Sequence, residues 1–272
     1  MHQANHSESR TGATNEVILV VDDDPFLLRL VCKQLEKLGQ KAQAVPTGAE
    51  ALELLAETSS VALVLLDFQM PNTNGVELAK LIRQIELHRS TPIILMTATS
   101  SFTCEVPANS GINGLLAKPF TINQLERIIN QWSSCLNETM ETTNARCKNS
   151  VDDEQFERTG TPVFDLQKLR GTFGDEDCLE VIRTFATAHA NSPKRLLAAR
   201  EAVALPELKA LAHKLKGAAS MACLKELAQT SGLLEQASAR ADWAEIDKLL
   251  HQLPRQFERA EKALSSVLAG KT

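Results

Sequence analysis

The stretch Val17-Ile-Leu-Val-Val-Asp-Asp-Asp-Pro25 predicts how the first half of the chain folds. Its first five residues are apolar and mostly β-branched, which is typical of a strand buried on both faces of a parallel sheet. The run ends abruptly in three aspartates, and Pro25 suits the first turn of a following helix. A buried strand, a charged end and a helix together indicate the start of a repeating βα unit.

Four more strand-like runs follow within residues 16–133, at 42–45, 61–66, 92–96 and 114–117, and they alternate with helical patterns at about 25–38, 48–57, 76–86 and 121–132. Residues 100–110 contain Pro107 and show little periodicity, so at most a weak helix is expected there. Five strands that alternate with helices predict an α/β doubly wound, five-stranded parallel sheet covered on both faces.

Polar residues follow several of these strands. Asp22 and Asp23 follow the first, Asp67 the third, Thr97 the fourth and Lys118 the fifth. The carboxyl ends of parallel strands form one edge, where ligands of such sheets bind. Carboxylates that converge there would repel one another unless a cation joins them, and Mg²⁺ favours oxygen ligands of this kind. Together with an ammonium group and a hydroxyl, they form a site suited to phosphoryl transfer to a carboxylate.

An aspartate after a strand is most often a helix cap or a turn residue, and Lys118-Pro119 could be a simple turn. Five such residues at the strand ends of one compact unit, however, rarely coincide by chance. Residues 17–132 resemble the receiver domain of two-component response regulators, with a flavodoxin-like fold. The resemblance is carried by the motifs Val-Val-Asp22-Asp-Asp-Pro, Leu-Leu-Asp67-Phe-Gln-Met-Pro-Asn-Thr-Asn-Gly, Met-Thr97-Ala and Ala-Lys118-Pro-Phe.

The resemblance implies that Asp67 accepts a phosphoryl group and that Thr97 and Lys118 contact it. It implies a Mg²⁺ site formed by Asp22, Asp23, Asp67 and the main-chain carbonyl of Gln69. It also implies a cis bond between Lys118 and Pro119, which only an X-Pro bond adopts at modest cost. This sequence departs from the family at Leu115, where an aromatic residue that turns inward on activation is common.

The composition changes twice outside this domain. Residues 1–15 are polar and are expected to be disordered. Residues 134–163 are rich in Asn, Glu, Thr and Ser, and they are expected to form a flexible linker. A coil of about 30 residues spans roughly 30 Å, and up to roughly 100 Å when stretched, so the two domains could reach each other.

Residues 164–268 show only helical periodicity, with helices expected at about 165–171, 175–190, 193–202, 206–222, 225–239 and 242–268. Four of these are long and amphipathic, which predicts an all-α four-helix bundle. Asp175 or Asp242 could cap the helix that follows it. Pro254 is expected to kink or divide the last helix.

The helix at 206–222 carries His213. Its apolar stripe consists of Leu208, Leu211, Ala212, Leu215, Ala219 and Ala222. His213 lies roughly 140° from the centre of that stripe, so its imidazole is expected to face water. Lys209 and Lys216 lie about one turn to either side of it, and Gly217 follows at i+4, which leaves room for an anion to approach. The helical wheel alone would favour an ordinary surface histidine.

The sequence Ala-His213-Lys-Leu-Lys216-Gly217-Ala-Ala-Ser resembles the phosphoacceptor motif of histidine phosphotransfer (HPt) domains. The resemblance implies that His213 accepts a phosphoryl group from a receiver aspartate. It also implies that Lys216 attracts the negative charge of that group and that Gly217 lets the loops of the receiver close in. A glycine often found six residues beyond Gly217 is replaced by Cys223. The other histidines (His2, His6, His88, His189 and His251) belong to no such motif.

The composition narrows the possible functions. The chain has 272 residues, a formal net charge of -5, six scattered cysteines and no tyrosine. These features indicate two domains in a reducing cytoplasm, with no general attraction to nucleic acid and no membrane-spanning run. The sequence resembles no ATP-dependent kinase, so an intermediate in phosphoryl transfer is expected rather than an enzyme that uses ATP.

The sequence therefore predicts a phosphorelay protein. Asp67 would receive the group from a sensor histidine kinase, and His213 would pass it to or from the receiver domain of another response regulator. Three alternatives stay open: a binding module controlled by phosphorylation, a phosphate sink, and the C-terminal part of a hybrid sensor kinase. A DNA-binding regulator is disfavoured, because no helix has the basic face that reading DNA requires.

Overall fold

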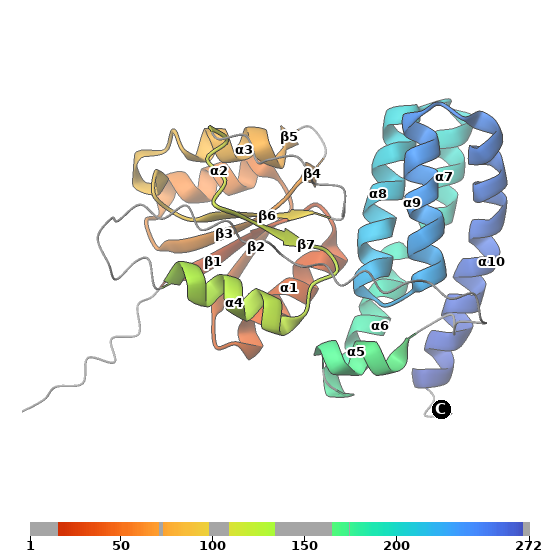
Figure 1. The fold of residues 1–272 in the computed structure, drawn as a ribbon, viewed down its shortest axis with the longest axis horizontal. Helices are drawn as coiled ribbons and strands as arrows, with labels where there is room; N and C mark the ends of the chain where they lie inside the picture. Colours follow the sequence, from red (N-terminus) through yellow and green to blue (C-terminus); the bar gives the residue numbers. More distant parts are fainter. Residues whose placement is uncertain (1–15, 71–72, 98–108, 134–164, 174, 269–272) are drawn as a thin grey trace, which may run out of the picture.

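The computed structural model describes residues 16–70, 73–97, 109–133, 165–173 and 175–268. The predicted N-terminal lead, the predicted linker and most of the predicted weak helix at 100–110 lie outside these residues. Figure 1 shows an α/β domain beside a bundle of helices, which confirms both predicted fold classes.

The first domain is built on a parallel sheet with the strand order β2-β1-β3-β6-β7. Buried apolar side chains alternate between its two faces, so each face carries its own core. One face packs against α1 and α4, and the other packs against α2 and α3. The strands are β1 (Val17–Val21), β2 (Lys41–Val45), β3 (Val61–Asp67), β6 (Ile93–Thr97) and β7 (Gly114–Ala117). The helices are α1 (Pro25–Lys37), α2 (Gly48–Glu57), α3 (Gly75–Ile82) and α4 (Ile122–Ser133), with a short 3-10 helix at Glu86–His88.

Two short strands, β4 (Gln69–Met70) and β5 (Thr73–Asn74), were not expected from the sequence. They form an antiparallel pair directly after β3. Gly75 then begins α3, and its backbone N–H donates to the carbonyl of Phe68 at 2.9 Å. The loop after Asp67 is thereby folded back over the end of its own strand.

The register of the sheet brings the strand ends level with one another. Val21 of β1 pairs with Leu66 of β3, and Asp67 pairs with Met96 of β6. Thr97 in turn pairs with Ala117 of β7. The polar residues that end or follow these strands must therefore lie along one edge.

The second domain contains α5 (Leu166–Phe173), α6 (Asp175–His189), α7 (Ser192–Glu201), α8 (Leu205–Met221), α9 (Lys225–Ala239) and α10 (Trp243–Leu268). The predicted apolar stripe of α8 faces the core of the bundle: Leu211 is partly buried, and the other residues of the stripe are buried. Asp242 accepts a hydrogen bond from the backbone N–H of Glu245 at 3.1 Å and so caps α10. Pro254 does not divide the last helix, because α10 continues through it; of the two expected effects, a kink or a division, division is excluded. Buried Leu253 and Phe257 anchor this part of α10 to the bundle core, which offsets the hydrogen bond that proline removes.

The two domains pack against each other through α1 and α6. Phe26 of α1 meets Phe185 of α6 edge to face, with ring centroids 5.5 Å apart. Glu180 of α6 pairs with Arg29 at 2.6 Å and with Lys33.

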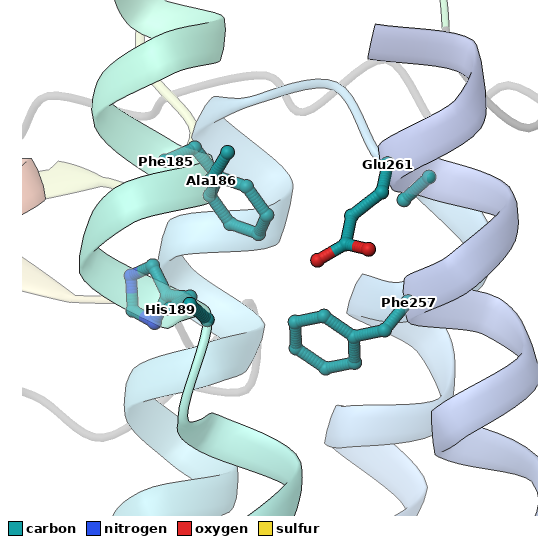
Figure 2. Close-up of a pocket in the computed structure, with 7 residues that line it drawn as sticks. Phe185, Ala186, His189, Phe257 and Glu261 are labelled. Carbon is teal, nitrogen blue, oxygen red and sulfur yellow. The ribbon is translucent and has the colours of Figure 1, made fainter. Parts of the chain in front are cut away.

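Two side chains of α6 point in different directions. Figure 2 shows the ring of Phe185 pointing towards Phe257 of α10, while the imidazole of His189 is turned away from that helix. His189 Nε2 lies 3.3 Å from Asp24 Oδ2 of the first domain. The interface thus combines an aromatic centre with charged contacts.

Gly75 offers a test of how tightly the loop after Asp67 is packed. A Cβ at this position would lie 2.4 Å from the carbonyl oxygen of Asp67 and 2.6 Å from Leu95 Cδ1. We expect Gly75→Ala to lower the free energy of unfolding by about 1–3 kcal/mol, because backbone cannot move aside cheaply. Urea denaturation of the full chain measures this. Gly48→Ala is the control, since its Cβ would meet side-chain atoms alone, the nearest a methyl group of Leu78 at 3.2 Å. Equal losses in the two variants would contradict the prediction.

Candidate functional site

The carboxyl edge of the sheet holds a buried ammonium group between two carboxylates. Lys118 Nζ lies 2.7 Å from Asp22 Oδ2 and 2.7 Å from Asp67 Oδ1. All three side chains are almost completely buried. Asp22, Asp23 and Asp67 each offer an oxygen, and these three oxygens lie within 4.8 Å of one another. The structure therefore brings together the acidic residues that the sequence placed at separate strand ends.

Backbone groups fix the orientation of these side chains. The N–H of Asp24 donates to Asp22 Oδ1 at 2.9 Å, and the N–H of Gln69 donates to Asp67 Oδ2 at 3.0 Å. The N–H of Lys118 donates to the carbonyl of Thr97 at 2.6 Å. The Lys118-Pro119 bond is cis, as expected. Thr97, the last residue of β6, is buried at the same edge. Every predicted site residue of the first domain thus lies at this edge or in the loop that leaves it.

The site holds more negative than positive charge. Burial raises the pKa of the Asp22 carboxyl, the charge of Asp67 raises it further, and Lys118 lowers it; the result is a pKa of about 7. Burial lowers the pKa of Lys118, but Asp22 and Asp67 outweigh this effect and raise the pKa well above its ordinary value. Three carboxyl groups converge here around the buried ammonium of Lys118, so the site is rich in oxygen ligands and holds more acidic than basic groups. These residues fit a hard divalent cation such as Mg²⁺.

The second set of predicted residues lies on α8. His213 Nδ1 is 2.7 Å from Glu235 Oε1 of α9, and Lys216 Nζ is 3.4 Å from Glu235 Oε2. Gly217 lies about one turn beyond His213 on α8 and is buried. Sequence reasoning missed Glu235, because its only signal is its place on a neighbouring helix, which the chain does not reveal without the packing of the bundle.

The carboxyl of Glu235 is held in its charged form. Burial raises its pKa, but the hydrogen bond and charge of His213, together with the charge of Lys216, outweigh burial and hold the pKa below its ordinary value. A charged carboxylate can only accept hydrogen bonds. His213 must therefore carry a proton on Nδ1 and donate it to Glu235. In the neutral imidazole, Nε2 is then the nitrogen without a proton.

The expectation that His213 faces water is wrong in this structure, because the residue is only 5% exposed. The next residue along α8 shows why. Lys214 Nζ donates to the main-chain carbonyl of Asp23 at 2.7 Å and to Asp23 Oδ2 at 2.8 Å. The acidic edge of the first domain therefore lies against this part of α8. The helical wheel considers α8 alone, so it could include neither Glu235 of α9 nor the first domain.

Lys214 and His189 are further residues whose partners the sequence did not indicate. Each contacts an aspartate of the Asp22-Asp23-Asp24 run, from α8 and α6 respectively. Both contacts join residues that are far apart in the chain, so no local pattern could predict them. The three aspartates thus contribute to the acidic edge of the sheet, cap α1 through Asp24 and form part of the domain interface.

The comparisons with known proteins agree with this architecture. Residues 18–130 match the family described as "Response regulator receiver domain", and residues 176–263 match the family described as "Hpt domain". The chain is 33% identical over 106 residues to a chemotaxis protein CheY homolog of Campylobacter jejuni, covering 38% of this chain and 82% of that protein. It is 29% identical over 253 residues to the sensor histidine kinase GacS of Pseudomonas protegens, covering 88% of this chain.

The chain spans 26% of the length of GacS, and between 7 and 13% of two other hybrid signalling proteins that it matches. A solved receiver domain, that of the sensor histidine kinase PA1611 from Pseudomonas aeruginosa, is 29% identical with a TM-score of 0.40; the match covers 44% of this chain and 98% of that one.

A sheet domain with an acidic carboxyl edge and a helical bundle with a histidine motif together define a two-module phosphotransfer protein. The chain belongs to the response regulator receiver family and carries an Hpt domain after its receiver domain. This combination supports a role in phosphorelay signalling. Within the described ranges, none of the helices has the length and apolar character needed to cross a membrane.

The contact between His213 and Glu235 predicts the tautomer of the imidazole. We expect neutral His213 to carry its proton on Nδ1, and Glu235→Leu to shift the population towards the Nε2–H form, because the acceptor is lost. Long-range ¹H–¹⁵N NMR of the imidazole at about pH 8, above the ordinary pKa of histidine, distinguishes the two forms.

Glu226→Leu serves as the matched control, because it removes another carboxylate of α9, one that pairs with Arg259 instead. The control should leave the His213 signals unchanged. A wild-type spectrum dominated by the Nε2–H form would contradict the prediction.

Proposed function

We propose that this chain relays a phosphoryl group between Asp67 of its receiver domain and His213 of its HPt domain. The contact of Lys214 with Asp23 carries the proposal, because it places the helix of the one acceptor against the site of the other. The receiver would comprise residues 16–133 and the HPt domain residues 164–268.

In the receiver, a carboxylate oxygen of Asp67 would attack the phosphorus atom of a phosphohistidine. The new O–P bond forms as the N–P bond to the donor breaks, and the electron pair of that bond stays on the donor nitrogen. Lys118 already contacts Asp67 Oδ1, so its ammonium is placed to neutralise charge on the incoming group. The hydroxyl of Thr97, at the same edge, would donate a hydrogen bond to a phosphoryl oxygen.

Asp22, Asp23 and Asp67 would hold Mg²⁺, with the main-chain carbonyl of Gln69 as a further ligand. The mutual distance of the three carboxylate oxygens and the excess of acidic over basic groups at this edge support this assignment. When bound, the ion would supply positive charge that stabilises the oxygens of the transferring group.

In the HPt domain, the Nε2 lone pair of His213 would attack the phosphorus atom held by Asp67. An N–P bond then forms as the acyl O–P bond breaks, and the carboxylate of Asp67 is restored. Glu235 would support this step by holding the proton on Nδ1, so that the lone pair stays on Nε2. Lys216 would attract the phosphoryl oxygens, and Gly217 would leave room for them.

A sensor histidine kinase would supply the phosphoryl group, and a receiver domain of another response regulator would exchange it with His213. The similarity to GacS over both domains supports a place beside, or within, a sensor kinase. A cytoplasmic location would agree with these partners.

A second candidate function is a binding module in which phosphorylated Asp67 alters the grip of the receiver on the bundle. The aromatic and charged contacts between α1 and α6 favour this candidate, because they form an interface without any transfer of phosphate. His213 is dispensable for such a module and essential for a relay.

The chemical stability of the bound phosphate distinguishes a relay from a binding module. After incubation with labelled acetyl phosphate and Mg²⁺, we expect wild-type protein to carry label that is stable to base and labile to acid, as phosphohistidine is. This label should be lost in Asp67→Ala and in His213→Gln, while His251→Gln, which alters an exposed histidine of α10, should retain it.

Label confined to the base-labile aspartyl form would refute transfer from Asp67 to His213 and favour the binding module. Histidine label that persists in Asp67→Ala would show that His213 is loaded without its own receiver.

A further inference from the structure

Lys214 forms the most direct link between the bundle and the acidic site of the receiver. Its ammonium bridges the carbonyl oxygen and the carboxylate of Asp23, at 2.7 and 2.8 Å. Both side chains are largely shielded, with 22% and 21% of their side-chain surface exposed. A contact of this kind is stronger than a fully exposed ion pair, because less water screens it.

The carboxylate that Lys214 binds is also one of the three that converge at the carboxyl edge. A divalent cation at that edge would draw on the same negative charge and would repel the nearby ammonium. The ammonium of the bundle and a cation from solution would therefore compete for Asp23.

We propose that Lys214 makes docking of the HPt domain and divalent metal binding by the receiver antagonistic. This inference rests on the metal site assigned under the proposed function. Because coupling between two binding events is reciprocal, docking must weaken metal binding by the same factor by which the metal weakens docking.

Formal charges show what this antagonism would do in a relay. If all three carboxylates are ionised, they and Lys118 give the site a net charge of -2, which a divalent ion would cancel. A phosphoryl group on Asp67 restores negative charge and so attracts Lys214 again. The attraction is then weakest in the receiver that has kept its metal ion and lost its phosphoryl group. The contact loosens after transfer, when His213 must become accessible to another receiver.

The other interface contacts allow the proposed antagonism to be tested without changing any residue of the metal site. Glu180 of α6 pairs with Arg29 and Lys33 of α1, and docking of the bundle on the receiver depends in part on these ion pairs. Glu180→Lys places a third positive charge beside them and should weaken docking. It leaves every residue of the acidic edge unchanged.

The test is a double-mutant cycle on the full chain, with the affinity for Mg²⁺ alone measured by isothermal titration calorimetry. We expect Lys214→Met to bind Mg²⁺ about fivefold more tightly than wild type, near the low end of typical coupling between sites. Glu180→Lys should tighten binding to a similar degree, and the double variant should gain little more. Lys209→Met, which removes an exposed lysine of the same helix, should match wild type.

The outcomes separate the inference from the site on which it rests. Equal affinities in wild type, Lys214→Met and Glu180→Lys would overturn the inference while leaving the metal site in place. Tighter binding in Lys214→Met alone, or additive gains in the double variant, would also overturn it, because Lys214 would then act as a local charge and not through docking. If no variant binds Mg²⁺, the metal site itself fails.

Discussion

The excess of negative charge at the carboxyl edge of the sheet is the constraint on which the rest of this structure depends. Burying ionised groups is costly unless they are paired and hydrogen-bonded. The fold therefore surrounds Asp22 and Asp67 with a buried ammonium and with directed backbone N–H groups. The level strand ends, the close approach of Gly75 and the placement of Lys118 all serve to hold these charges in one position.

The bundle contributes two side chains that contact the aspartates at this edge. It contributes Lys214 to Asp23 and His189 to Asp24, so two of the three consecutive aspartates have partners in the second domain. On the bundle itself, Glu235 gathers His213 and Lys216 around one carboxylate. Acidic and basic side chains are thus paired within each site, and Lys214 pairs an ammonium of the bundle with a carboxylate of the receiver.

The sequence predicted most of the fold and the site, for identifiable reasons. Buried parallel strands, capped helices and the apolar stripe of α8 depend on neighbours within a few residues, and motif spacing then places Asp22, Asp67 and Lys118 at strand ends. The roles of Glu235 and Lys214, and the burial of His213, depend on contacts between segments far apart in the chain. The continuation of α10 through Pro254 depends likewise on packing around it. Local patterns contain no information about such contacts.

The domain interface contains two kinds of contact, which would respond differently to the proposed phosphorylation of Asp67. The edge-to-face pair of Phe26 and Phe185 is apolar, and its strength does not depend on the charge at the acidic edge. The contact of Lys214 with Asp23 depends on that charge directly, since it is electrostatic and largely shielded from water. An interface with only the aromatic contact would not sense the state of Asp67, and one with only the ion pair would be weak. Together they would allow the domains to stay associated while, in the proposed relay, the contact of Lys214 with Asp23 changes with each transfer.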